Sequence, residues 1–99
     1  MRRKAKVDAN QSEIVSALRE VGASVAVTSA LGKGFPDIVV GFRGINYLME
    51  IKDGEKSPSR QKLTYDEQIW LSLWRGQVNV VNSVKAALDV LGLSLPSQP

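Results

Sequence analysis

Three charged residues interrupt an otherwise apolar stretch in the first half of the chain: Asp37 where it begins, and Glu50 and Lys52 where it ends. The residues between them are rich in β-branched and aromatic side chains, which predicts two strands, 38–42 and 45–51, joined by a tight turn. Because side chains alternate between the two faces of a strand, Glu50 and Lys52 point to the same side. Pairing through the short turn also brings Asp37 to the end of the sheet where Glu50 lies.

Two carboxylates and an ammonium that converge in this way allow two interpretations, because a buried charge is costly unless it is paired or bound to a metal. In the first, Lys52 forms a strand-end salt bridge with Asp37 or Glu50 and has no further role. In the second, the two carboxylates and the backbone carbonyl of Ile51 bind a divalent cation, and Lys52 orients or helps to deprotonate a water molecule. That arrangement suits the hydrolysis of phosphodiester bonds, because Lys52 can also stabilise negative charge near the scissile phosphate.

Composition limits the chemistry that is available. The 99 residues include no cysteine and no histidine, which excludes disulfides, thiolate zinc sites, histidine general bases and Ser-His-Asp triads. A metal site must then use oxygen ligands, which favours Mg²⁺ or Mn²⁺. The net charge of +3 suits an anionic partner without requiring one. The sequence contains no apolar run of membrane-spanning length and no secretory signal, so we expect a cytoplasmic location in a bacterial or phage-infected host cell.

Hydrophobic periodicity predicts the elements that must position the charged residues. The pattern indicates a helix over 10–21, a strand over 24–28, a helix over 64–74, a strand over 78–81 and a helix over 84–91. With the central hairpin, the order is α-β-β-β-α-β-α. We therefore expect an α/β sandwich in which a mixed four-stranded sheet is flanked by helices.

The first two predicted helices begin with the spacing of a capping box. Asn10 is followed three residues later by Glu13, and Thr64 by Glu67. The helix over 64–74 also has a wide apolar face, which indicates burial on two sides, against the sheet and against a second subunit.

The chain is expected to form one domain, residues 1–99, with a basic arm at 1–9 and a flexible tail at 93–99. Basic side chains also flank the predicted hairpin. Each of them either contacts a phosphate of a nucleic acid or lies solvated in a loop. These residues are Lys33 before the hairpin, and Lys56, Arg60 and Lys62 after it.

These residues and their order resemble the PD-(D/E)XK nuclease superfamily, in which Pro-Asp and Glu-x-Lys motifs stand on neighbouring strands. The motif Gly34-Phe35-Pro36-Asp37 and the segment 75–83 narrow the resemblance to the VRR-NUC family, and it extends over about residues 10 to 92. One departure is Asn82, which stands where that family usually has an Arg. The change removes a charge without touching the predicted metal ligands.

The resemblance implies a restriction-endonuclease-like fold and a Mg²⁺- or Mn²⁺-dependent endonuclease. Its substrate would be branched DNA such as a Holliday junction, cut by a homodimer to leave a 5′-phosphate and a 3′-hydroxyl. In the resembling family a Glu of the first helix reaches the metal, and here that residue is Glu13; the alternative is that Glu13 only closes the capping box. A Gln near the start of the next long helix assists the site, and here that residue is Gln68, or else Glu67 if the alignment shifts by one; a surface Gln is the alternative. The catalytic set is then Asp37, Glu50, Lys52, Gln68 and Glu13, and the metal ligands are Asp37, Glu50, Glu13 and the carbonyl of Ile51.

Two other classes of function fit the same residues. One is a DNA-binding protein that keeps the scaffold without the catalysis, although the intact set of Asp37, Glu50 and Lys52 argues against it. The other is a structural or interaction domain, for which DNA binding would be absent or insensitive to salt.

Overall fold

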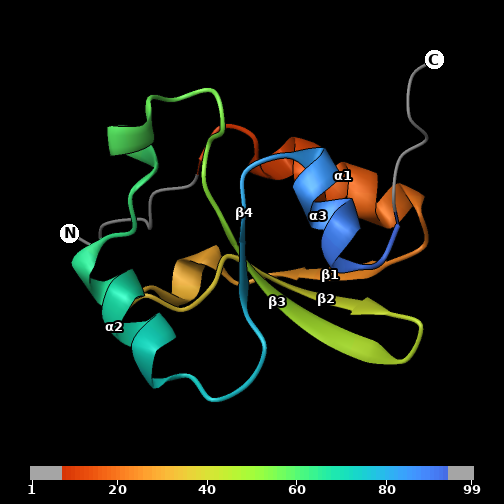
Figure 1. Ribbon diagram of the computed structural model, residues 1–99. Helices are drawn as coiled ribbons and strands as arrows, with labels where there is room; N and C mark the ends of the chain where they lie inside the picture. The colour runs from red at the N-terminus through yellow and green to blue at the C-terminus, as the bar shows by residue number, and fades with distance from the viewer. Residues whose placement is uncertain (1–7, 94–99) are drawn as a thin grey trace.

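The computed structural model describes residues 8–93 (Figure 1). Residues 1–7 of the predicted basic arm and residues 94–99 of the predicted tail lie outside the described residues. The predicted order of helices and strands is confirmed, and two short 3₁₀ turns, η1 and η2, are added to it. The elements are α1 (Gln11–Glu20), β1 (Ser24–Val27), η1 (Ser29–Leu31), β2 (Ile38–Phe42), β3 (Ile45–Ile51), η2 (Pro58–Gln61), α2 (Tyr65–Leu73), β4 (Asn79–Val81) and α3 (Val84–Val90). Among residues 8–93, no helix has the length and apolar character needed to cross a membrane.

The four strands form one mixed sheet in the order β1-β2-β3-β4. The first three form an antiparallel meander, and β4 pairs parallel to β3, so the predicted mixed four-stranded sheet is confirmed. The β2–β3 hairpin turns at Arg43 and Gly44, whose φ angles of 51° and 80° are both positive. Two positive φ values at the centre of a two-residue turn match the right-handed twist of the paired strands. The predicted tight turn at these two residues is therefore confirmed.

One face of the sheet carries the core. The helices α1 and α3 pack against each other and lie together over the sheet (Figure 1). Alternate residues of the strands point into this layer because successive side chains of a strand face opposite sides. The core side chains contributed by these elements include Ile14 and Leu18 of α1, Ile38 and Val40 of β2, Met49 and Ile51 of β3, and Val81 of β4.

The helix α2 lies outside this core, and none of its residues is buried. The prediction that it packs against the sheet is wrong, because the loop before β2 contacts it instead: Trp70 meets Phe35 edge to face, with ring centroids 5.3 Å apart. The same loop runs so close to α2 that a Cβ atom at Gly34 would clash with the main-chain carbonyl of Asp66. The rest of the apolar face stays exposed, and we call it the α2 surface: Tyr65, Ile69, Leu73 and Trp74.

Candidate functional site

The three charged residues singled out in the sequence lie together at one end of the sheet. Asp37 immediately precedes β2, and Glu50 and Lys52 lie at the carboxyl end of β3. The register of the hairpin pairs Ile38 with Met49, which sets Asp37 beside Glu50. The predicted convergence follows from this short antiparallel pairing.

Asp37 is held rigidly by hydrogen bonds. The main-chain amide of Ile51 donates to Oδ2 of Asp37 at 2.8 Å, across the two strands. The hydroxyl of Ser29 lies 3.3 Å from Oδ1 of Asp37 and 3.0 Å from the side-chain oxygen of Gln11. Burial raises the pKa of Asp37, and the hydrogen bond from Ile51 only partly offsets that effect. The hydrogen bonds thus fix the position of the Asp37 side chain, but they do not fully offset the cost of burying its negative charge.

Glu50 is the most buried charged residue of the site, with 3% of its surface exposed. Burial, together with the neighbouring Glu67 and Asp37, raises its pKa to about 10, and the opposing effect of Lys52 is smaller. In the absence of a cation Glu50 therefore carries a proton at neutral pH. A divalent cation at this position would replace that proton and favour the ionised form.

Lys52 makes its shortest charged contact with a residue of α2. Its Nζ lies 2.7 Å from Oε1 of Glu67 and 3.7 Å from Oε2 of Glu50. Burial disfavours the charged form of Lys52, but the two glutamates outweigh burial and raise its pKa. Burial likewise acts to raise the pKa of Glu67, yet hydrogen bonds from Glu50, Lys52 and the amide of Thr64 lower it. Lys52 and Glu67 are therefore a charged pair at neutral pH.

The α2 helix presents Glu67, and not Gln68, to Lys52. Gln68 is exposed, and its side-chain amide donates to the carbonyl of Leu63 at 3.1 Å. Glu67 also closes the predicted capping box with Thr64, which is confirmed. The sequence did not distinguish the two residues. Neighbouring side chains of a helix point in directions about 100° apart, so a shift of one position in the alignment changes which of them faces Lys52.

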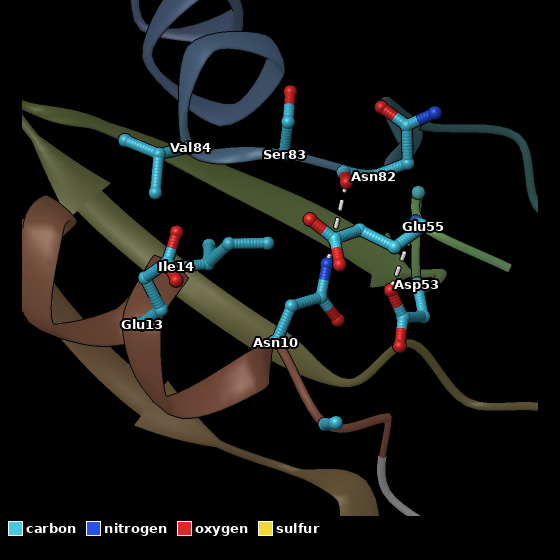
Figure 2. Close-up of a pocket in the computed structure, with 10 residues that line it drawn as sticks. Asn10, Glu13, Ile14, Asp53, Glu55, Asn82, Ser83 and Val84 are labelled. Atoms are coloured by element: carbon cyan, nitrogen blue, oxygen red, sulfur yellow. Dashed lines mark hydrogen bonds between the residues drawn. The ribbon is translucent and has the colours of Figure 1, made fainter.

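Glu13 lies elsewhere. It is exposed and lines a pocket of about 490 Å³ together with Asn10, Asp53, Glu55 and Asn82 (Figure 2). None of Asp37, Glu50 and Lys52 lines this pocket. The α1 side chain that connects to Asp37, through Ser29, is Gln11, which the sequence analysis missed. The sequence does indicate that Gln11 is buried, because it lies three residues before Ile14 and on the same face of the helix as the buried apolar residues.

The predicted capping box at Asn10 is wrong, because Asn10 makes no side-chain bond to its own helix. Its amide donates instead to the carbonyl of Lys52 at 3.1 Å and to that of Asn82 at 3.3 Å, the latter drawn in Figure 2. Lys52 also donates its main-chain amide to Val81 at 2.9 Å. Asn10 thus ties the start of α1 to the ends of β3 and β4.

Asn82 stands at the position where the resembling family has an Arg. Its side-chain amide donates to Gln61 at 3.4 Å, and Gly54 packs so closely on it that a Cβ there would lie 2.6 Å from the carbonyl oxygen of Asn82. The polar segment after β3 is therefore held over the end of β4.

Of the residues predicted to contact nucleic acid, Lys33 lies before β2, and Lys56, Arg60 and Lys62 lie between β3 and α2. Lys33 and Lys62 are exposed, whereas Lys56 is half-buried and pairs with Asp8 at 3.5 Å. Arg60 belongs to η2, but its side chain lies outside the described residues. Contact of these residues with DNA stays a prediction.

The chemistry of the donor set fits a magnesium-like cation. Among residues 8–93, the carboxylates do not form a ready-made group of three or more metal ligands. However, Mg²⁺ keeps several water ligands, so two carboxylates and a backbone carbonyl suffice. Glu50 is buried and the neighbouring Asp37 is half-buried, and burial raises the pKa of each. Carboxylates in that situation are stabilised in their ionised form by a divalent cation.

Comparison with known proteins bears on the fold. No protein-family model matches the sequence. No curated protein is significantly similar to it. A solved structure described as a VRR_NUC domain is similar in fold: the two share 24% sequence identity over 83% of this chain and 89% of that chain, with a TM-score of 0.60. The chain therefore has the fold of a VRR_NUC domain, as its sequence motifs predict.

Proposed function

We propose that the protein is a metal-dependent endonuclease that hydrolyses phosphodiester bonds in DNA. One observation carries the proposal: Asp37, Glu50 and Lys52 converge at the end of the β2–β3 hairpin, in a fold shared with a VRR_NUC domain. The alternative interpretation, a strand-end salt bridge, accounts less well for a buried carboxyl group, Glu50, beside a half-buried one, Asp37, with a single nearby ammonium.

Each residue then has a distinct part in the reaction. Asp37, Glu50 and the carbonyl of Ile51 hold Mg²⁺ or Mn²⁺, which when bound lowers the pKa of a water ligand and neutralises charge on the phosphate. The bond from the amide of Ile51 fixes one oxygen of Asp37, so this carboxylate needs no reorganisation during binding. Lys52 orients the attacking water and stabilises the negative charge that develops on the phosphate.

The other predicted site residues receive less support from their positions. Glu13 lines the pocket of Figure 2, and Gln68 bonds to the main chain at Leu63. The α1 and α2 residues that connect to the site are instead Gln11, which reaches Asp37 through Ser29, and Glu67, which pairs with Lys52. We keep the metal-ligand assignment for Asp37 and Glu50 and do not extend it to Glu13.

We further propose that the enzyme acts as a homodimer on branched DNA. The α2 surface is apolar and exposed, with 72% of Leu73 and 76% of Tyr65 accessible, which suits contact with a second copy of the chain. Two sites related by a two-fold axis can cut two strands of a symmetric junction. The basic loop residues would contact the DNA backbone, so recognition would depend on shape and charge more than on base sequence.

The test is cleavage of a labelled four-way junction, with a linear duplex and a replication fork in parallel. Wild type and Lys52→Ala are compared in Mg²⁺, in Mn²⁺ and in EDTA. The proposal expects cutting that needs the metal and is lost in the variant. Cutting of forks in preference to junctions would keep the chemistry and change the substrate. DNA binding without any cutting would replace the proposal with that of a non-catalytic DNA-binding protein.

A further inference from the structure

We propose that Glu67 is a positioning residue, which holds the ammonium of Lys52 beside Glu50 and directs its remaining N–H donors toward the reacting phosphate and water. The inference rests on the proposed nuclease function. It assigns a role to a residue of α2 that lies outside the Pro-Asp and Glu-x-Lys motifs.

The first support is the geometry of the ion pair. Glu67 lies 2.7 Å from Nζ of Lys52, a full ångström closer than Glu50 at 3.7 Å. The side chains of Lys52 and Glu67 are 12% and 18% exposed, so water screens the pair only weakly. Charge-assisted hydrogen bonds at this distance are strong and directional. Glu67 therefore fixes the position of the Lys52 ammonium.

The second support is that Glu67 is itself fixed. The main-chain amide of Thr64 donates to the same Oε1 atom at 2.8 Å, and the amide of Glu67 donates back to the hydroxyl of Thr64 at 3.2 Å. The first turn of α2 is in turn packed against the loop before β2 at Gly34, whose φ of +82° and lack of a Cβ atom allow the contact. The carboxylate that holds Lys52 is thereby fixed at the start of a helix and does not rotate freely.

The third support is the count of donors on the lysine. An ammonium has three N–H donors. Glu67 accepts a hydrogen bond from one of them at 2.7 Å, whereas Glu50, at 3.7 Å, lies beyond hydrogen-bond distance. The two remaining donors are available to a water molecule or a phosphate oxygen, and the bond to Glu67 sets their directions because the three N–H bonds have a fixed tetrahedral arrangement.

A fourth point separates a role in catalysis from helix capping alone. A carboxylate next to a phosphate site repels the substrate, so it costs DNA affinity. Gln serves the capping box as well as Glu does. A helix cap alone therefore gives no reason to place a negative charge at position 67.

The test uses Glu67→Gln, which keeps the cap and removes the charge, and Glu67→Asp, which keeps the charge on a shorter side chain. Asp66→Asn is the matched control, since it removes a carboxylate from the same exposed turn of α2 without a contact to Lys52. Three quantities are measured: the single-turnover rate of DNA cleavage, the affinity for DNA in EDTA, and the ¹H–¹⁵N signal of the Lys52 ammonium in metal-free protein. The signal is assigned by its absence in Lys52→Arg.

For Glu67→Gln we expect the cleavage rate to fall about 10- to 100-fold, the loss that misplacement of a catalytic group brings. DNA affinity should stay the same or increase, and the ammonium signal should be lost because the proton exchange of an unpaired ammonium is fast. Glu67→Asp should recover part of the rate and of the signal, and Asp66→Asn should match wild type in all three measurements.

Wild-type cleavage in Glu67→Gln, or an unchanged ammonium signal, would overturn the positioning role while leaving the nuclease intact. If wild type does not cut DNA at all, the proposed function fails, and the ammonium signal alone then decides whether Glu67 holds Lys52. The two failures are therefore distinguishable.

Discussion

The main-chain amide of Ile51 donates a hydrogen bond to Oδ2 of Asp37 at 2.8 Å, across the β2–β3 hairpin. This bond joins the residue before one strand to the end of the next, so the distance between the two proposed metal ligands depends on the hairpin register. A register slip by one residue would turn Glu50 to the other face of the sheet.

Asp37→Asn tests the ligand role with little change in shape. The amide oxygen can still accept the bond from Ile51, but it has no charge to offer a divalent cation. We expect cleavage to fall at least about 100-fold, as in other losses of transition-state electrostatics, with a small change in melting temperature. Asp89→Asn, on the outer face of α3 where Asp89 pairs with Lys85, is the control. Cleavage by Asp37→Asn at the wild-type rate would remove Asp37 from the mechanism.

The stability of the metal-free protein should decrease as pH rises. Burial and the neighbouring Glu67 and Asp37 raise the pKa of Glu50 from an ordinary value of 4.5 to about 10. Between these values the folded protein holds a proton that the unfolded chain has released, so its free energy of unfolding falls with increasing pH. The raised pKa of Asp37 acts in the same direction, and the lowered pKa of Glu67 acts below this range.

Thermal unfolding in EDTA from about pH 5 to about pH 9 measures this decrease. Glu50→Gln should flatten the curve, because the amide does not titrate. Addition of Mg²⁺ should raise the wild-type melting temperature more at the high end of the range than at the low end, since the cation competes with the proton on Glu50 and this competition weakens as the proton concentration falls. Parallel curves for wild type and Glu50→Gln would show that Glu50 is not the titrating group.

Asn10→Ala removes the two side-chain bonds to the carbonyls of Lys52 and Asn82. We expect a loss of about 1–3 kcal/mol in the free energy of unfolding, typical of carbonyls left without a donor, and a lower cleavage rate because the end of β3 is released. Chemical denaturation and the junction assay measure the two effects. Asn46→Ala, on an exposed position of the hairpin, is the control. Equal stability of both variants would contradict the tie between α1 and β3.

Leu73→Glu tests the α2 surface as a dimer interface. Leu73 is 72% exposed in the single chain, so a charge there is tolerated in a monomer but not in an apolar contact. Light scattering at micromolar concentration should give a dimer for wild type and a monomer for Leu73→Glu. Ile45→Glu, 54% exposed at the far end of the hairpin, should remain dimeric. A monomeric wild type would refute the dimer, and a dimeric Leu73→Glu would move the interface to another surface.

The sequence predicts those parts of the molecule that local patterns determine. Both strands of the hairpin have the predicted bounds, because their β-branched runs end at Arg43 and Gly44, where positive φ angles form the turn. The cap at Thr64 was predicted correctly for a similar reason, since both of its partners lie within four residues.

Long-range contacts account for what the sequence did not predict. The side chain of Asn10 has a local partner in the capping-box pattern, but it bonds to carbonyls 42 and 72 residues away. The periodicity of α2 correctly reveals an apolar face, yet periodicity carries no information on what covers that face. Gln11 reaches Asp37 only through Ser29, and such a relay between three segments has no signature in residue spacing.

The parallel pairing of β4 with β3 has a consequence for how the protein acquires its site. Lys52 bonds through its amide to Val81, which lies 29 positions further along the chain, and α2 with Glu67 is part of the intervening connection. Contacts that close such long loops form slowly compared with a hairpin. The two carboxylates can thus meet early in folding, on the β2–β3 hairpin, while Lys52 is fixed only after β4 has docked. A chain emerging from the ribosome would complete the cluster only after β4 has been synthesised.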